Sequence, residues 1–348
     1  MFRKDKFEQF KLCDSKGLII KTIDLHTAGE PLRVIYDGLP DIIAKSVLEF
    51  RKKMMNEYDY IREAVILEPR GHADMYGAIL LPPYREDIDF GVIFLHNEGY
   101  STMCGHGIIA LIKLAYELGL VDFKEPLTEI KIDTPAGIVN AFAEIKQGEL
   151  VRYYFRNVPS FIYKSNCSIY LESLGEIHFD IAFGGAFYAY VDTNNLKIDL
   201  TPQNVQQLIS YGRLIKKKVS EKYQINHPKH EDLSFLYGVI FYDGKTGNDS
   251  ISRNVCIFAD GEVDRSPTGT GVSGRLALHY LKGEIDIKDE ITIESIIGTR
   301  FKGRIFKEVD FCGFKSVIPE VEGKAYIIGK NEFFVDKEDS ISYGFFMR

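Results

Sequence analysis

Two short glycine-rich segments constrain the fold of this chain more than any other feature. One is Met-Cys-Gly-His-Gly at 103–107, and the other is Asp-Arg-Ser-Pro-Thr-Gly-Thr-Gly at 264–271. In each, a small side chain, Cys104 or Thr268, precedes a Gly-X-Gly sequence and then an apolar run that suits a buried helix. The sequence therefore predicts two helix N-termini that face one small substrate from opposite sides, one with a thiol and the other with a hydroxyl.

The pattern of strands and turns predicts an α+β fold with two pseudo-symmetric domains. Short β-type runs separated by turn signals fill both halves, and the two glycine turns hold corresponding places. We expect an N-terminal domain over 1–158 and a C-terminal domain over 159–334, with a cleft between them. The alternative is a chance resemblance between two glycine turns. Two finer predictions are a helix over 41–58 and a strand over 63–67.

Composition argues against several kinds of partner. The chain has 348 residues, of which 45% are hydrophobic, and its formal net charge is −7. This balance offers no basic surface to nucleic acid or to an anionic membrane. No apolar stretch reaches the length of a membrane span, and the charged start lacks the apolar segment of a signal peptide. We therefore expect a cytoplasmic protein that binds neither nucleic acid nor membrane.

Cysteine usage argues against a metal site and a disulfide framework. The cysteines are odd in number and widely spaced, and no two form a Cys-x-x-Cys pair. We therefore expect no bound metal. The five positions are Cys13, Cys104, Cys167, Cys256 and Cys312.

Cys104 is the strongest candidate for chemistry. A helix N-terminus favours an anion by about 0.3–1 kcal/mol and at most about 2 kcal/mol, and one pKa unit corresponds to about 1.36 kcal/mol. The dipole alone is expected to bring the thiol pKa from about 8.5 to roughly 7, so Cys104 would serve as a base near neutral pH. The alternative is a buried structural cysteine. Acyl transfer is disfavoured, because His106 is two residues away and does not easily place its ring on the sulfur.

The glycine segments also indicate how a ligand is held. Each Gly-X-Gly sequence lets a ligand approach bare backbone amides, and the absence of nucleotide-binding glycine motifs favours a carboxylate over a phosphate. A cationic substrate nitrogen would be held by Asp264, with a neutral His106 as a hydrogen-bond partner. The alternatives are a satisfied core histidine for His106 and a turn cap for Asp264.

On these residues the chain resembles the proline racemase family, which includes 4-hydroxyproline epimerases and trans-3-hydroxy-L-proline dehydratases. The resemblance covers nearly the whole chain in the family's order and is weaker over 195–235 and around 311–314. Besides the two glycine segments, the matching sequences are Ile-Asp-Leu-His-Thr-Ala-Gly-Glu-Pro-Leu-Arg at 23–33, Glu-Pro-Arg-Gly-His-Ala-Asp-Met-Tyr-Gly at 68–77, Gly-Tyr-Ser-Thr at 99–102, Thr-Pro-Ala-Gly at 134–137 and Asn-Val-Pro-Ser-Phe at 157–161.

The resemblance implies a fold and an active site. The fold is that of diaminopimelate epimerase, with each domain a curved, mostly antiparallel sheet around a central helix, and with the tail at about 335–348 returning to the first domain. It also implies a homodimer that needs no cofactor and takes a small imino-acid substrate in the interdomain cleft. Asp264 would help to hold the ring nitrogen. The substrate carboxylate would be held by the backbone of Gly105, His106, Gly269 and Thr270.

Racemases and epimerases that the chain resembles usually place two cysteine bases on opposite faces of the substrate, at the positions of Cys104 and Thr268. Threonine at the second position resembles the dehydratase branch, where threonine occupies this site. A hydroxyl does not ionise in the range that proton transfer needs, so Thr268 is a poor acid for returning a proton to Cα. We therefore expect dehydration of trans-3-hydroxy-L-proline to pyrroline-2-carboxylate. The Cys104 thiolate would take the α proton, and the same group, or a water it holds, would protonate the departing hydroxide.

Three alternatives stay open. They are a proline racemase or hydroxyproline epimerase with an unusual second site, a non-catalytic imino-acid-binding protein and a redox or regulatory thiol protein. The last is disfavoured, because no resolving cysteine lies close in sequence. The preferred hydroxyproline isomer, any residual racemase or epimerase activity, the proton donor to the leaving hydroxyl and the oligomer interface also stay open. So does the question of whether His26, His72 and Asp74 touch the substrate or brace the cleft.

Overall fold

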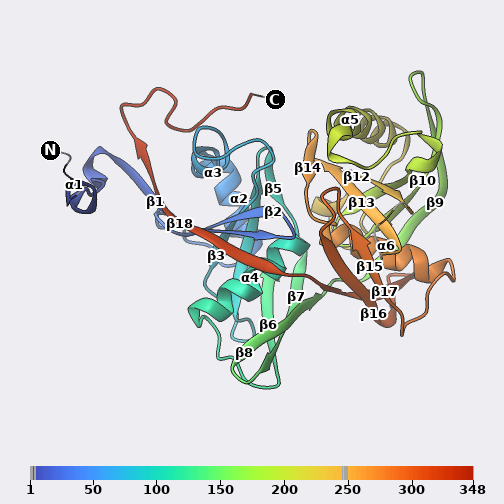
Figure 1. Cartoon of the computed structure of the whole chain (residues 1–348), viewed down its shortest axis with the longest axis horizontal. Coiled ribbons are helices and arrows are strands. Elements are labelled where there is room, and N and C mark those ends of the chain that lie inside the picture. The colour runs from blue at the N-terminus through green and yellow to red at the C-terminus, as the bar shows by residue number, and fades with distance from the viewer. Residues whose placement is uncertain (1–2, 4, 245, 247–249, 348) are drawn as a thin grey trace.

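The computed structural model describes residues 3, 5–244, 246 and 250–347. Two lobes lie side by side in Figure 1, and the chain passes between them twice. The first lobe contains the helices α1 (Asp5–Gln9), α2 (Val47–Glu57), α3 (Asp59–Ile66) and α4 (Gly105–Leu118), and the strands β1 (Gly17–Thr27), β2 (Glu30–Asp37), β3 (Gly77–Leu81), β4 (Phe90–His96), β5 (Gly99–Ser101), β6 (Leu127–Thr134), β7 (Gly137–Lys146), β8 (Glu149–Arg156) and β18 (Ala325–Asp336).

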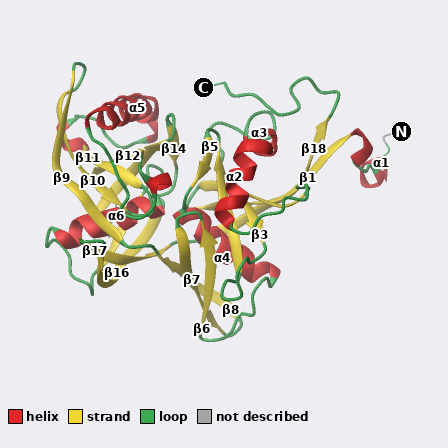
Figure 2. Ribbon diagram, turned by 180° about the vertical axis from the view of Figure 1, so that it is seen from behind, coloured by secondary structure: helices red, strands yellow, loops and turns green. Residues whose placement is uncertain are grey.

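The second lobe follows the same plan. It contains the helices α5 (Val205–Lys222) and α6 (Gly269–Leu281), and the strands β9 (Ser160–Leu171), β10 (Gly175–Phe183), β11 (Phe187–Asp192), β12 (Leu236–Asp243), β13 (Ser252–Phe258), β14 (Glu262–Asp264), β15 (Glu290–Glu294), β16 (Arg300–Phe311) and β17 (Phe314–Glu322). Seen from behind in Figure 2, α2 and α3 cover the first lobe and α5 covers the second.

The lobes repeat one order of elements with the same strand directions. In the first lobe, β4 pairs antiparallel with β5, the chain forms α4, and β6 returns parallel to β4. In the second, β13 pairs antiparallel with β14, the chain forms α6, and β15 returns parallel to β13. Antiparallel pairs then complete both lobes, as in β6–β7 and β15–β16. The predicted α+β fold of two pseudo-symmetric halves, each a mostly antiparallel sheet around a central helix, is confirmed.

The last strand belongs to the first lobe. β18 pairs with β1 from Thr27 opposite Ala325 to Gly17 opposite Asp336, just as β9 pairs with β10 in the second lobe. The chain therefore returns at Ala325, earlier than the tail expected at about 335–348, and residues 325–334 lie with the first lobe instead of the second. The place where the chain returns depends on the pairing of β18 with β1. Local sequence patterns do not reveal the register between two strands so far apart in sequence. The division between 158 and 159 stays a prediction.

Two local predictions differ from the structure. The helix expected over 41–58 begins only at Val47, because the Ser46 hydroxyl accepts a hydrogen bond from Glu49 N at 3.1 Å and caps it there. The strand expected over 63–67 is wrong, since those residues end α3 and lead out of it. A short apolar run is compatible with the two-residue period of a strand and with the 3.6-residue period of a helix. The helical spacing of buried side chains begins upstream of this run, at Ile61.

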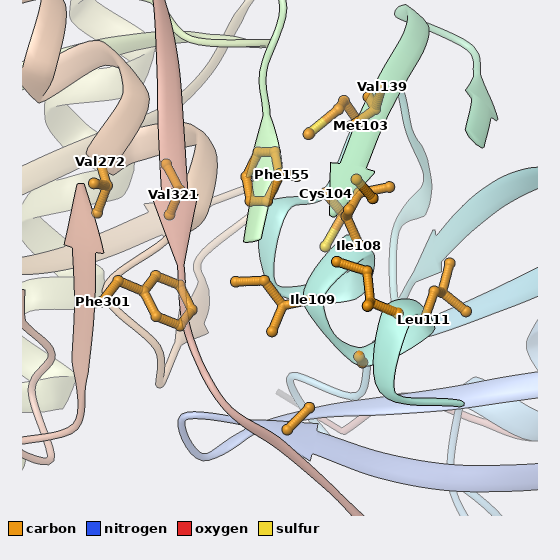
Figure 3. Packing of buried hydrophobic residues seen from close by; sticks show 14 of the residues in the cluster. Met103, Cys104, Ile108, Ile109, Leu111, Val139, Phe155, Val272, Phe301 and Val321 are labelled. Carbon is orange, nitrogen blue, oxygen red and sulfur yellow. The ribbon is translucent and has the colours of Figure 1, made fainter. Parts of the chain in front are cut away.

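One apolar core lies beneath both central helices. Figure 3 shows Ile108 and Ile109 of α4 beside Phe155 of β8, with Val321 of β17 and Phe301 of β16 next to them. Phe155 and Val321 are partners across β8 and β17, so the pairing joins the two lobes below the helices. This shared core fixes the N-termini of α4 and α6 at the junction of the lobes.

Candidate active site

Cys104 is the N-cap of α4, in the loop that follows β5. Its sulfur accepts a hydrogen bond from Gly107 N at 3.2 Å, and the residue is 5% exposed. A Cβ added at Gly107 would lie 3.1 Å from this sulfur and 2.5 Å from the Phe94 ring. Glycine at 107 therefore leaves the thiol its place over the first turn of the helix.

Thr268 holds the corresponding place before α6. Its φ of 66° is unusual for a β-branched residue, and the loop is held by Ser266, whose Oγ accepts from Thr268 N at 3.1 Å. The Thr268 hydroxyl lowers the pKa of the nearby Cys256 thiol. Even so, no group in the described ranges meets Thr268 Oγ1 in hydrogen-bond geometry, although the atom is buried. The Thr268 hydroxyl therefore lies on the lining of the cavity beside the Cys256 thiol.

The two helix N-termini meet head to head. A Cβ added to Gly105 would lie 2.6 Å from Gly269 Cα, and a Cβ added to Gly269 would lie 2.7 Å from Gly105 Cα. In the part of the chain that the structure describes, the N–H groups of the first two residues of each helix have no acceptor. Four amide donors and the positive ends of two helix dipoles therefore converge, which suits one carboxylate.

A small cavity lies where these N-termini meet, with about 310 Å³ of space between its lining atoms. That figure includes space open to solvent, and the part that the centre of a water molecule can enter is only about 20 Å³, which is room for about one water. Every site residue predicted from the sequence lines this cavity: Cys104, Gly105, His106, Asp264, Thr268, Gly269 and Thr270. The lining residues that sequence reasoning missed are Tyr76, Met103, Tyr188, Tyr237, Cys256 and Phe258.

Buried carboxyl groups lie on and behind the wall of the cavity. Asp264 lines it, and Glu30 accepts a hydrogen bond from Arg265 N at 2.7 Å behind it. Burial raises the pKa of Glu30 well above its usual range, and the charge of Asp264 adds to the rise. The raised pKa favours the neutral form of Glu30, so the carboxyl group that a positively charged ring nitrogen would meet on the lining is Asp264.

The low pKa expected for Cys104 is wrong for the empty cavity. Burial raises the pKa of the Cys104 thiol well above its usual range, and the charge of Asp264 raises it further. Hydrogen bonds from Gly107 N and from the Tyr76 hydroxyl lower the pKa, but by less than burial raises it. The sulfur loses its contact with water on folding, and this loss raises the pKa by more than the local field of the helix N-terminus lowers it.

His106 lies closer to the sulfur than the sequence suggested. Its Nδ1 is 3.2 Å and its Nε2 is 3.7 Å from Cys104 Sγ, so the ring does reach the thiol. Burial lowers the pKa of His106, in line with the neutral ring that we expected. A ring at this distance can share the thiol proton with the sulfur.

The three residues whose roles the sequence left open lie outside the lining of the cavity. His26 stacks on Tyr326 with the ring centroids 5.4 Å apart, and the exposed His72 contacts Ala73 O at 2.7 Å. Asp74 braces the cleft, because its Oδ1 accepts from Val263 N at 3.0 Å and its carbonyl accepts from Arg265 Nη1 at 2.8 Å. β14 is thereby tied to the first lobe.

The raised pKa of Cys104 predicts how the thiol reacts in the ligand-free protein. A raised pKa means that the thiolate forms only at alkaline pH, so alkylation by iodoacetamide should be at least about 100-fold slower at pH 7 than at pH 10, compared with roughly 30-fold for a thiol of ordinary pKa. Mass spectrometry of the Cys104 peptide gives the rate at each pH, with the exposed Cys312 as an internal reference. Half-maximal reactivity near pH 7 would contradict this prediction and restore the dipole argument.

Within the described ranges, none of the helices combines the length and the apolar character needed to cross a bilayer. Nor do three His, Cys, Asp or Glu side chains gather there in a way that could hold a metal ion.

The fold and the site together define a class of two-domain α+β proteins in which a thiol from one lobe and a hydroxyl from the other line a single small cavity. The sequence profile of the family described as proline racemase matches residues 22–346. The chain belongs to the proline racemase family.

Similar proteins are named as a dehydratase and as epimerases. A "Trans-3-hydroxy-L-proline dehydratase" of Colwellia psychrerythraea is 48% identical over 345 residues, which cover 99% of this chain and 97% of that protein. A "3-hydroxyproline 2-epimerase" of Burkholderia multivorans is 42% identical over 94% of this chain and 98% of that protein. The crystal structure of a hydroxyproline epimerase from Agrobacterium vitis with bound trans-4-hydroxy-L-proline matches with a TM-score of 0.87 and 30% identity, over 94% of this chain and 96% of that one.

Proposed function

We propose that this protein is a hydro-lyase that removes water from trans-3-hydroxy-L-proline and yields pyrroline-2-carboxylate, without a cofactor. The observation that carries the proposal is the asymmetry of the cavity, where Cys104 lies on one helix and Thr268 on the other. A thiol can exchange a proton with a carbon acid, whereas a threonine hydroxyl cannot supply a proton at comparable cost. The similarity to proteins named trans-3-hydroxy-L-proline dehydratase supports the same reading.

The four amide donors at the two helix N-termini would hold the substrate carboxylate. They also stabilise the negative charge that grows on this group as the Cα–H bond breaks. Asp264 would hold the positively charged ring nitrogen, and that charge would offset the carboxylates that now raise the pKa of Cys104. Substrate binding would therefore favour the thiolate at the moment when a base is needed.

The stereochemistry of the substrate suits a single base. In trans-3-hydroxy-L-proline the carboxylate and the hydroxyl lie on opposite ring faces, so the α hydrogen and the hydroxyl share a face. Cys104 would take the α proton on that face, and the hydroxide would leave as water from the same side. The enamine that remains would tautomerise to pyrroline-2-carboxylate, and Thr268 would close the opposite face without exchanging a proton.

An assay of the 3- and 4-hydroxyproline isomers and of L-proline tests this function. Nuclear magnetic resonance should show pyrroline-2-carboxylate from trans-3-hydroxy-L-proline and from no other isomer at a comparable rate. Epimers formed without loss of water would instead assign the protein as a racemase or epimerase. Tight binding without turnover of any isomer would assign it as an imino-acid-binding protein.

The head-to-head contact of the helices predicts a large effect of one methyl group. Gly105→Ala should lower kcat/KM at least about 100-fold, because its Cβ would force the helix ends apart and a displacement of about 1 Å at a reacting centre costs about that factor. Gly244→Ala is the matched control, since its Cβ meets open space, and should change kcat/KM less than about twofold. Wild-type kinetics for Gly105→Ala would contradict the proposed carboxylate site.

We further propose that the protein works in the cytoplasm, as its odd number of scattered cysteines favours, and that it is a homodimer, as its resemblance to the family implies. Light scattering at working concentration tests whether the protein is a homodimer. A molar mass of one chain together with full activity would contradict it.

A further inference from the structure

Tyr76 is a cavity residue to which the mechanism above gives no part. It lies directly before β3, is 3% exposed, and sets its ring edge-on to His106 with the centroids 4.9 Å apart. Its hydroxyl donates a hydrogen bond to Ser101 Oγ at 2.5 Å. A phenol on the first lobe, in the same cavity as Cys104, would face the side of the substrate ring on which Cys104 is proposed to act.

A chain of hydroxyl groups starts at Tyr76 and crosses the cleft. Ser101, at the end of β5, also contacts the hydroxyl of Tyr237 at 2.7 Å, and Tyr237 lies on β12 of the second lobe. Both tyrosines and Cys104 line the same cavity. The chain therefore links the two lobes and holds the Tyr76 hydroxyl in one place beside the ligand.

The same phenol lies close to the sulfur. Tyr76 and Cys104 line the same cavity, and the Tyr76 hydroxyl, whose proton is donated to Ser101 Oγ, lowers the pKa of the thiol. Burial raises the pKa of both Tyr76 and Tyr237 well above the usual range, so both phenols keep their protons at physiological pH. Tyr76 is thus a neutral phenol that lies near the base and lines the substrate cavity at the same time.

We propose that Tyr76 hands the proton to the departing hydroxyl group, with Ser101 and Tyr237 as the residues that position it. This inference rests on the proposed dehydratase function and names the proton donor for it. Cys104 and the leaving oxygen then need not meet directly, because the phenol bridges them.

The proposed step balances. The Cα–H bond breaks and its proton goes to the Cys104 thiolate, while the electron pair of that bond forms the double bond to the neighbouring carbon. The C–O bond at that carbon breaks with its electron pair on oxygen. The Tyr76 hydroxyl proton passes to this oxygen, which leaves as water, and the Cys104 thiol proton passes to the Tyr76 oxygen. The thiolate and the phenol are both restored.

Other hydroxyl groups of the cavity are less suited. Tyr188 is held by Thr270 Oγ1 at 2.8 Å on the second lobe, away from the base. Thr268 lies on that same lobe, across from Cys104. Tyr76 belongs to the first lobe with Cys104, lies against His106 and also lines the cavity.

Tyr76→Phe tests the proposal through a ratio of two rates on the same protein. One rate is water loss from trans-3-hydroxy-L-proline, and the other is deuterium uptake at Cα of L-proline in heavy water, which needs Cys104 but no leaving group. We expect water loss to fall at least about 100-fold while deuterium uptake falls less than about 10-fold. The ratio does not depend on the fraction of protein that folds.

Two further variants complete the test. Ser101→Ala should lower the same ratio in the same direction but less, because the phenol stays and loses only its anchor. Tyr153→Phe is the matched control, since it removes a buried phenol of the first lobe that lies outside the lining of the cavity, and should leave the ratio within about threefold of the wild type.

The outcomes separate the proposals. Water loss and deuterium uptake that fall together in Tyr76→Phe, or that both persist, would overturn the role of Tyr76 while the wild-type dehydratase activity stands. A wild-type protein that takes up deuterium but releases no water would overturn the proposed function and the relay together.

Discussion

Cys104→Ala is expected to lower water loss from trans-3-hydroxy-L-proline at least about 1,000-fold and deuterium uptake at Cα of L-proline to the same extent. Removal of a general base costs about 100- to 10,000-fold in typical enzymes. Both rates should fall, since Cys104 is proposed to break the Cα–H bond in each reaction. His106 does not replace the thiol, because burial lowers its pKa and leaves it a weak base.

The control for this variant is another buried cysteine. Cys167→Ala removes a thiol of β9 that lies outside the lining of the cavity, and kcat/KM should change less than about twofold. Cys104→Ser separates the base from the shape of the site, and should be nearly as inactive as Cys104→Ala because its hydroxyl does not ionise. Turnover by Cys104→Ala within about 10-fold of the wild type would contradict the assignment of the base.

Thr268→Cys is expected to give the protein a racemase activity that the wild type lacks. A thiol at this position would supply an acid on the second ring face, so protonation of Cα from that side would produce D-proline from L-proline. The substitution costs little, because Thr268 Oγ1 has no partner in hydrogen-bond geometry among the described residues and the two side chains are of similar size. We expect D-proline to form at least about 100-fold faster than in the wild type.

Chiral chromatography of L-proline incubations measures this gain. Thr268→Ser is the matched control, because it keeps a hydroxyl at the same backbone position and should form no more D-proline than the wild type. A Thr268→Cys protein that still dehydrates trans-3-hydroxy-L-proline but forms no D-proline would show that the second face is closed by something other than this hydroxyl.

The sequence was sufficient for the features that depend on neighbouring residues. Cys104 and Thr268 each stand immediately before Gly-X-Gly and a buried helix, and this local pattern predicted both N-caps. The repeat of that pattern predicted two halves of one plan, which the matching strand directions around α4 and α6 confirm.

The features that the sequence did not reveal depend on long-range pairing. Tyr237 reaches the cavity from β12, and Tyr76 from the start of β3, so neither has a sequence neighbour in either glycine segment. The segment 68–77 that carried the family resemblance does contain Tyr76, which was the one available signal. β18 pairs with β1 across almost the whole length of the chain, and no local pattern indicates that register.

The pKa of Cys104 also depends on residues that are far apart in sequence. The helix N-terminus is a local property and was predicted, but burial and the charge of Asp264 arise only when two lobes close around the thiol. Together, burial and the charge of Asp264 raise the pKa of Cys104 by more than the helix N-terminus lowers it. The pKa is therefore raised, whereas the sequence predicted a lowered one.

The central claim is that one base acts on one face of the ring, and L-proline in heavy water tests it most directly. The wild-type protein should introduce deuterium at Cα and return L-proline, because Cys104 removes the proton and delivers deuterium to the same face. D-proline formed as fast as deuterium enters would contradict the claim, since it requires a working acid on the face that Thr268 occupies.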